Sequence, residues 1–155
     1  MIKVIVVDDE RFVRMGIVGE TDWASLGCEV VGEAENGLDA LELVHEKNPD
    51  LMICDIRMPK MNGLEMLKKL REEKNPVQVI FLTAYSEFSY AREALKLYAF
   101  DYLLKPFEDG ELENAILRAK ERIETDREKR RGTGLSRSVL DKAPVKEQYP
   151  GALEG

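Results

Sequence analysis

Carboxylates, a hydroxyl and an amine each follow an apolar run of this sequence, and together they could handle a cation and a phosphoryl group. These polar residues are Asp8, Asp9, Asp55, Thr83 and Lys105. Carboxylates held within a few ångström of one another repel, and their pKa values rise unless a cation lies among them. Hard oxygen ligands select Mg²⁺, which keeps some of its waters and leaves room for a phosphoryl oxygen.

The lysine and the hydroxyl make sense beside such a cluster if a doubly charged anion forms there. Lys105 would pair with one phosphoryl oxygen and Thr83 would donate a hydrogen bond to another, while Mg²⁺ would contact a third. The acceptor of the phosphoryl group should be the carboxylate that stands alone at the end of its apolar run. That residue is Asp55.

The apolar pattern predicts the elements that bring these groups together. Five strands are expected, at residues 3–7, 28–34, 51–54, 77–82 and 102–104, and a helix is expected after each of them. This alternation predicts an α/β fold, with a doubly wound parallel sheet and helices on both of its faces. Because functional groups of such sheets collect at the carboxyl ends of the strands, the polar residues should meet at one edge.

Segments of this sequence resemble the receiver domain of two-component response regulators, over about residues 1–123. The segments are VVDDE, CDIRMPKMNG, LTAY and DYLLKPF, in this order. The resemblance implies a flavodoxin-like sheet with strand order 2-1-3-4-5. It also implies a signalling switch rather than an enzyme: Asp55 would accept a phosphoryl group from a sensor histidine kinase with Mg²⁺, and the domain would assist its own phosphotransfer and dephosphorylation.

The resemblance assigns metal ligands residue by residue. Asp9 and Asp55 match direct Mg²⁺ ligands, and the backbone carbonyl of Arg57 matches a third. Asp8 would hold the ion through a water molecule. Mg²⁺ is therefore the expected cofactor.

The resemblance also assigns a switch. Thr83 and Tyr102 match a pair in which the hydroxyl moves toward the phosphoryl group and the aromatic ring turns into the vacated space. Lys105 matches the lysine of the family, and its bond to Pro106 is expected to be cis. Proline is the residue for which a cis bond is least unfavourable.

A narrower resemblance is to receivers that precede an AraC-type helix-turn-helix domain. It rests on DWASLGCEVVGEAENGLDAL and AYSEFSYAREALKLYAFDYLLKPF. The expected partners are a sensor histidine kinase and a second copy of the chain, bound through the fourth helix, fifth strand and fifth helix after phosphorylation. DNA would be contacted only through an output domain outside these residues. A receiver or adaptor without such an output stays open.

Other functions that use the same residue types fit less well. Phosphohydrolases of the haloacid dehalogenase type also use an aspartate nucleophile, but they carry a second aspartate two residues later, where this chain has Arg57. A dinucleotide-binding domain would need glycines after the first strand, where this chain has an acidic run. A receiver that works without phosphorylation would not need the complete acidic set.

Composition bounds the domain organisation. The chain has 155 residues and a net charge of -7, which argues against binding of polyphosphates by this chain alone. Residues 1–123 are expected to form the receiver domain. Residues 124–155 are expected to be a charged helix extension followed by a largely disordered linker. No apolar run approaches the roughly 20 residues that span a bilayer, so we expect no membrane contact and a cytoplasmic location.

Several other residues have simpler expected roles. Cys28 and Cys54 should be buried thiols, and His45 should lie on the surface, so the phosphodonor histidine must come from a partner. The pairs Asn36-Gly37 and Asn62-Gly63 are expected in turns, in a conformation that glycine tolerates. The fourth helix, expected from Glu87 to Tyr98 with Ser86 as its cap, carries more apolar surface than one sheet face needs.

Overall fold

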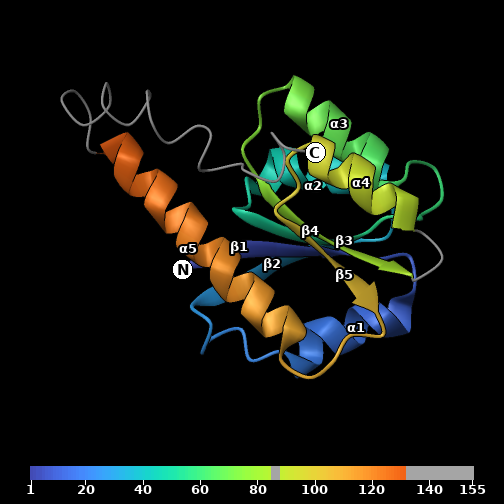
Figure 1. The fold of residues 1–155 in the computed structure, drawn as a ribbon, viewed down its shortest axis with the longest axis horizontal. Helices are drawn as coiled ribbons and strands as arrows, with labels where there is room; N and C mark the ends of the chain where they lie inside the picture. Colours follow the sequence, from blue (N-terminus) through green and yellow to red (C-terminus); the bar gives the residue numbers. More distant parts are fainter. Residues whose placement is uncertain (85–87, 132–155) are drawn as a thin grey trace.

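The computed structural model describes residues 1–84 and 88–131, and these contain the predicted alternation of strands and helices (Figure 1). The strands are β1 (Ile2–Val7), β2 (Cys28–Ala34), β3 (Leu51–Asp55), β4 (Gln78–Ala84) and β5 (Asp101–Lys105). The helices are α1 (Arg11–Glu20), α2 (Gly37–Lys47), α3 (Gly63–Glu72), α4 (Phe88–Lys96) and α5 (Glu111–Arg131). In the described part of the chain, every helix is too short or too polar to cross a membrane.

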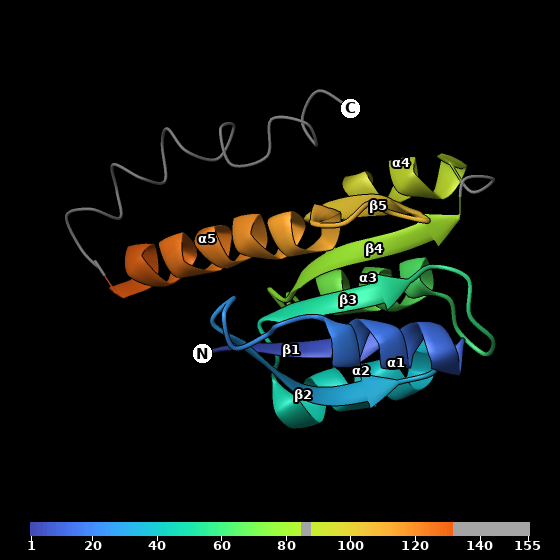
Figure 2. The same cartoon turned by 90° about the horizontal axis from the view of Figure 1, so that it is seen from below.

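The strands form one parallel sheet in the order β2-β1-β3-β4-β5, which confirms the predicted fold class and strand order. Helices α2, α3 and α4 cover one face, and α1 and α5 cover the other (Figure 2). From β1 the chain goes to β2, which lies on one side of β1 in the sheet, and then to β3, which lies on the other side of β1. The carboxyl ends of β1 and β3 therefore flank the switch point of the strand order, where ligands bind in open α/β sheets.

Each face of the sheet has its own buried core. The core under α2, α3 and α4 contains Ile5, Val7, Met52, Cys54, Val79 and Phe81, and we call it the α2–α4 core. The core under α1 and α5 contains Val4, Val6, Leu51, Ile53, Ile80 and Leu82, and we call it the α1–α5 core. Because side chains alternate along a strand, Asp55 and Lys105 belong to the side of the α1–α5 core. Thr83 and Tyr102 belong to the side of the α2–α4 core.

The two Asn-Gly pairs begin helices and do not form turns with left-handed glycines, so that prediction was wrong. Asn36 and Asn62 accept hydrogen bonds as the N-caps of α2 and α3. The glycines are required by close packing instead. A Cβ atom at Gly63 would lie 2.7 Å from the backbone oxygen of Asp55, and one at Gly37 would lie 2.5 Å from the backbone oxygen of Met61, in the loop before α3. Gly63 thus lets α3 begin directly against the end of β3.

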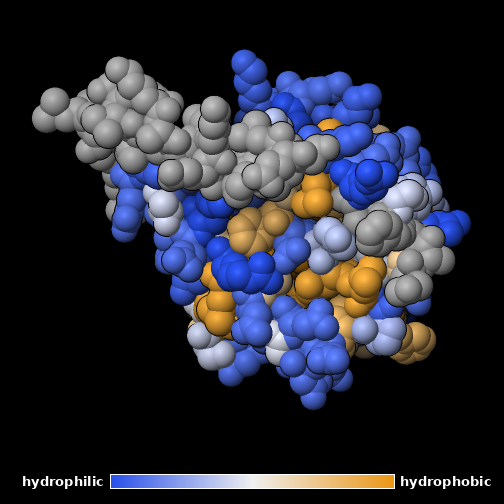
Figure 3. Space-filling view, viewed as in Figure 1, coloured by the Kyte–Doolittle hydropathy of each residue, from blue (hydrophilic) through white to orange (hydrophobic). Residues whose placement is uncertain are grey.

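Helix α4 is shorter than predicted and ends at Lys96, while Ser86, its predicted cap, lies outside the described residues. Leu97 and Tyr98 follow the helix, and Tyr98 adopts a left-handed backbone conformation with a φ of 60°. The side chains of Leu95 and Tyr98 are exposed, as is Leu117 on α5. Figure 3 shows hydrophobic side chains on this face of the molecule, around β5 and between α4 and α5.

Helix α5 continues beyond the apolar stripe that packs on the sheet. The stripe ends at Ile123, and the helix ends at Arg131. In the added turns, Arg127 donates a hydrogen bond of 2.6 Å to the carboxylate of Asp50, just before β3. The same carboxylate accepts a hydrogen bond from the backbone N–H of Lys3 in β1. The charged end of α5 is therefore held against the amino-terminal edge of the sheet.

The expectations for the two cysteines and for His45 are confirmed. Cys28 and Cys54 are buried and have free thiols. Burial raises the pKa of both thiols. His45 is exposed on α2 and lies 2.7 Å from a carboxylate oxygen of Glu73.

Candidate functional site

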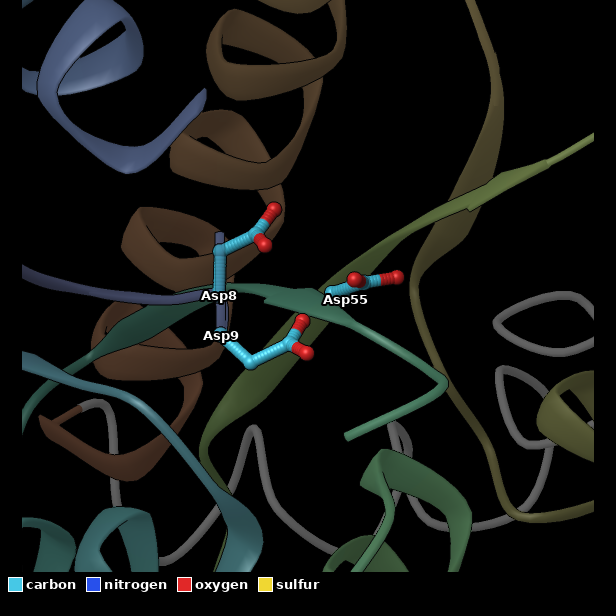
Figure 4. Close-up of side chains that lie close together, drawn as sticks. All are labelled: Asp8, Asp9 and Asp55. Atoms are coloured by element: carbon cyan, nitrogen blue, oxygen red, sulfur yellow. The ribbon is translucent and has the colours of Figure 1, made fainter. Parts of the chain in front are cut away.

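Three carboxylates meet at the carboxyl-terminal edge of the sheet, as predicted. One oxygen from each of Asp8, Asp9 and Asp55 lies within 4.8 Å of the others. Figure 4 shows Asp8 and Asp9 reaching from the end of β1 toward Asp55 at the end of β3. Asp8 is fully buried and Asp55 is 7% exposed, whereas Asp9 faces solvent.

Backbone hydrogen bonds fix both strand ends. The N–H of Asp8 donates to the carbonyl of Ala34 in β2, which extends the pairing of β1 by one residue. The carboxylate of Asp8 then accepts from the N–H of Glu10, 2.9 Å away, and this bond closes the turn into α1. At β3, the carboxylate of Asp55 accepts from the N–H of Ile56 at 2.8 Å. The two carboxylates are thus oriented by their own backbone.

Lys105 lies between the two buried carboxylates. Its Nζ is 3.2 Å from Oδ2 of Asp8 and 3.5 Å from Oδ2 of Asp55. Burial lowers the pKa of Lys105, but Asp55 and Asp8 outweigh this effect, and the net result is a raised pKa. The amine is therefore held in its charged form at the point where an incoming anion would need a cation.

The charge of the cluster is only partly neutralised. Burial is the main cause that raises the pKa of Asp55, from 3.8 to about 7. Lys105 opposes this rise, whereas the carboxylates of Asp8 and Asp9 add to it. The donor set is three carboxylates with a single amine beside them, and such hard oxygen donors suit Mg²⁺ better than a softer metal. These residues fit the predicted ion by their chemistry.

The predicted switch residues lie on β4 and β5, with their side chains on the face of the sheet opposite to Asp55 and Lys105. Thr83 is buried and follows Leu82, the residue of β4 that is paired with Asp55. In β5, Tyr102 is partly buried and packs against the α2–α4 core. Since Tyr102 pairs with a residue two positions before Thr83, both side chains belong to the same face.

Two further predictions concern the loops at this edge. The bond between Lys105 and Pro106 is cis, as predicted. Arg57 is exposed in the loop after β3, and the role of its backbone carbonyl as a metal ligand stays a prediction.

One residue of the site escaped the sequence interpretation, namely Arg14 of α1. It is 8% exposed, and its guanidinium donates to the backbone carbonyl of Asp8. The helix itself was predicted from its apolar residues, but Phe12 is 86% exposed and the buried positions are Arg14 and Ile17. The spacing of three residues between Arg14 and Ile17 was the available signal, because such residues share a helix face.

Comparison with known proteins agrees with this geometry. A family model described as "Response regulator receiver domain" matches residues 4–117. The transcriptional regulatory protein YesN of Bacillus subtilis (strain 168) is 40% identical over 116 residues, which are 75% of this chain and 32% of YesN. BtsR of Salmonella typhimurium is 42% identical over 125 residues, 78% of this chain and 49% of BtsR. The chain thus spans about a third to a half of the curated relatives that it matches.

Solved structures show the same fold. The receiver (REC) domain of AraT, a response regulator from Geobacillus stearothermophilus, superposes with a TM-score of 0.76 at 42% identity, and the match covers 81% of this chain and 97% of that one. A two-component transcriptional regulator AraC from Clostridium phytofermentans ISDg superposes with a TM-score of 0.75 at 26% identity, covering 82% and 98%. The chain therefore belongs to the response regulator receiver domain family of two-component systems.

Proposed function

We propose that this chain is a phosphorylation-activated switch in which Asp55 accepts a phosphoryl group from a phosphohistidine of a sensor histidine kinase. The observation that carries the proposal is the arrangement at the sheet edge. A buried carboxylate stands at the end of β3, two further carboxylates lie within 4.8 Å, and the amine of Lys105 lies 3.5 Å away. An acceptor, a cation site and a fixed positive charge are the parts that phosphoryl transfer requires.

The transfer step follows from these parts. A carboxylate oxygen of Asp55 attacks phosphorus, a P–O bond forms, and the P–N bond to the donor imidazole breaks. Lys105 and the hydroxyl of Thr83 would contact phosphoryl oxygens and meet the charge that develops there. Asp55 must be ionised to attack, and its pKa of about 7 makes that ionisation sensitive to pH near neutrality. Bound at Asp8, Asp9 and Asp55, Mg²⁺ would supply positive charge that offsets both the carboxylates and the phosphoryl oxygens.

The donor histidine is assigned to a partner protein. His45 is the single histidine of the chain, and it lies in α2, exposed beside Glu73. Because His45 lies near the end of α2, away from the carboxyl-terminal edge of the sheet, it is not placed to donate to Asp55 within one molecule. The membership of the family supports a kinase as the source of the phosphoryl group.

The output surface is assigned to α4, β5 and α5. Leu95, Tyr98 and Leu117 expose apolar side chains there, and a hollow of about 640 Å³ along β5 is lined in part by Tyr102. We assign this face to phosphorylation-dependent pairing with a second copy, because exposed apolar groups around an edge strand favour burial against a partner. Movement of Thr83 and Tyr102 would change this face and so shift an existing equilibrium between two states.

The remaining assignments concern the whole protein. Residues 1–123 are assigned to the receiver and residues 124–155 to a helix extension and linker. An AraC-type DNA-binding domain is the assigned output, supported by the likeness to a structure described as a two-component transcriptional regulator AraC. The working location is assigned to the cytoplasm, where response regulators meet their kinases.

Incubation with a small phosphodonor and Mg²⁺, followed by intact mass spectrometry, tests the central assignment. Asp55→Asn should abolish the covalent phosphate. Asp50→Asn is the matched control, because Asp50 precedes the same strand at its opposite end, and it should label like the unmodified protein. Labelling that survives Asp55→Asn, or that proceeds fully in a chelator, would refute the assignment.

The oligomeric state tests the output surface. Addition of a beryllofluoride mimic with Mg²⁺ should move the protein to a larger species in size-exclusion chromatography. Leu95→Glu should prevent that shift while leaving the labelling of Asp55 intact. An unchanged elution volume for the unmodified protein would contradict pairing through this face and favour a receiver without a dimeric output.

A further inference from the structure

Arg14 is a buried cation that connects α1 with the ends of β1 and β2. We propose that Arg14 is a positioning residue for Mg²⁺, holding the turn that carries Asp8 and Asp9 in its binding geometry before the ion arrives. This inference rests on the proposed function, because it concerns the same metal site. It assigns a role to a side chain that does not itself face the phosphoryl group.

The first step of the argument is the set of hydrogen bonds around Asp8. Its backbone N–H donates to Ala34, its carboxylate accepts from the N–H of Glu10, and its backbone carbonyl accepts from the guanidinium of Arg14. The first two bonds come from the backbone and form with any side chain in α1. Of the three, the bond from Arg14 is the one that a substitution outside the acidic cluster can remove.

The second step concerns what holds Arg14 itself. Its Nε donates to Glu33 of β2 at 3.0 Å, and another guanidinium nitrogen lies 3.6 Å from Glu35, just after that strand. A planar guanidinium can donate hydrogen bonds to carboxylates and to a carbonyl at the same time, because its N–H groups point in fixed, different directions. Arg14 therefore ties the turn after β1 to β2, its neighbour in the sheet.

The third step separates geometry from charge. Glu33 and Glu35 provide two carboxylates beside one guanidinium, so Arg14 brings little net positive charge to the acidic cluster. Among the contacts of the described residues, Arg14 has none with Asp55 or Lys105. Its effect must therefore pass through the backbone of Asp8, and it should alter binding of the ion more than the transfer step.

A partner that orients a metal ligand typically changes metal affinity by about 10- to 100-fold when it is removed. We expect Arg14→Met to weaken Mg²⁺ binding by about tenfold or more. Methionine retains an unbranched apolar side chain in the buried space but removes the donors. Titration calorimetry without phosphodonor measures this affinity, and amide chemical shifts of residues 8–10 report the turn directly.

Arg71 provides a matched control. It is another arginine whose guanidinium donates to backbone carbonyls, namely those of Asn75, Val77, Leu97 and Tyr98. These carbonyls follow α3 and α4, at the amino-terminal edge of the sheet, away from the acidic cluster. Arg71→Met should lower the stability of the fold and leave the Mg²⁺ affinity unchanged. Arg14→Lys should recover part of the affinity, because a lysine can still donate to the carbonyl of Asp8.

Kinetics provides a second readout. In Arg14→Met the Mg²⁺ concentration needed for half-maximal labelling should rise, while the rate at saturating Mg²⁺ stays near that of the unmodified protein. Equal affinity in Arg14→Met and the unmodified protein would overturn the inference, as would an equal loss in Arg71→Met. If Arg14→Met fails to fold, Arg14→Leu, which also lacks the donors, allows the same comparison, and an unchanged affinity there would overturn the inference too. Failure of the unmodified protein to label at Asp55 would instead refute the proposed function. The comparison of Mg²⁺ affinities would still test the role of Arg14.

Discussion

Replacing Asp55 by asparagine isolates the energetic effect of a carboxylate held in a buried acidic cluster. The amide has nearly the same shape and can keep the hydrogen bond from the N–H of Ile56, but it carries no charge. The pKa of Asp55 rises from 3.8 to about 7 on folding. The folded protein therefore holds the proton more tightly than the unfolded chain, and stability falls as the pH rises through this window.

The size of the effect follows from the shift. One unit of pKa corresponds to about 1.4 kcal/mol, so the full shift would amount to roughly 4 kcal/mol, of which roughly 3 kcal/mol appears between pH 5 and pH 8. Because Asp55 lies at the edge of the sheet and water reaches the site, we reduce this figure by half, to about 1.5 kcal/mol. The stability of Asp55→Asn relative to the unmodified protein should increase by that amount from pH 5 to pH 8.

Urea unfolding of both proteins across this pH range, in a chelating buffer, measures the difference. All other titrating groups are shared, so their contributions largely cancel in the comparison. Excess Mg²⁺ at pH 8 should stabilise the unmodified protein and have little effect on Asp55→Asn, which removes a charged ligand. A stability difference that stays constant with pH would refute the reasoning, because it would mean that Asp55 titrates alike in both states.

Three other substitutions, one of them with a matched control, probe separate parts of the structure. Lys105→Met removes the charge that lowers the pKa of Asp55, so the pH profile of labelling should move to higher pH and labelling at neutral pH should slow. Gly63→Ala places a methyl group 2.7 Å from a backbone oxygen and should destabilise the protein by about 1–3 kcal/mol in urea unfolding. Gly19→Ala, in open space on α1, is its control and should stabilise by about 0.5 kcal/mol. Arg127→Met removes one half of the ion pair at the amino-terminal edge and should destabilise by about 1 kcal/mol; equal midpoints would show that this end of α5 is not anchored.

The fold and the acidic site could be predicted because both depend on where apolar runs stop. A strand that is buried on both faces reads as a continuous apolar run, and its last residue marks the carboxyl edge of the sheet. Asp55 and Lys105 follow such runs, so their meeting required only parallel strands. The burial that raises the pKa of Asp55 could not be derived, because it depends on how closely loops and helices cover the strand ends.

Interactions between side chains and distant backbone groups were not predictable. Arg14 looks like one of several charged residues on a surface helix, and nothing in the sequence shows that the carbonyl of Asp8 lies within its reach. The prediction for the Asn-Gly pairs was wrong for the same reason. Glycine suits a left-handed turn and a close contact equally well. The sequence does not show whether a glycine is needed for a positive φ or for the close approach of a backbone oxygen.

The alternation of side chains along β3, β4 and β5 has a consequence for how a signal would travel. Asp55 and Lys105 project toward the side of α1 and α5, whereas Thr83 and Tyr102 project toward the side of α2, α3 and α4. The proposed phosphoryl transfer to Asp55 would therefore take place on one side of the sheet, and the proposed movements of Thr83 and Tyr102 on the other. The structural change would pass from Asp55 to the other face of the sheet at the ends of the strands, through the hydroxyl of Thr83 and the ring of Tyr102. The core beneath α1 would not need to rearrange. Hydrogen exchange after phosphorylation should then change in α4 and β5 and remain unaltered in β1.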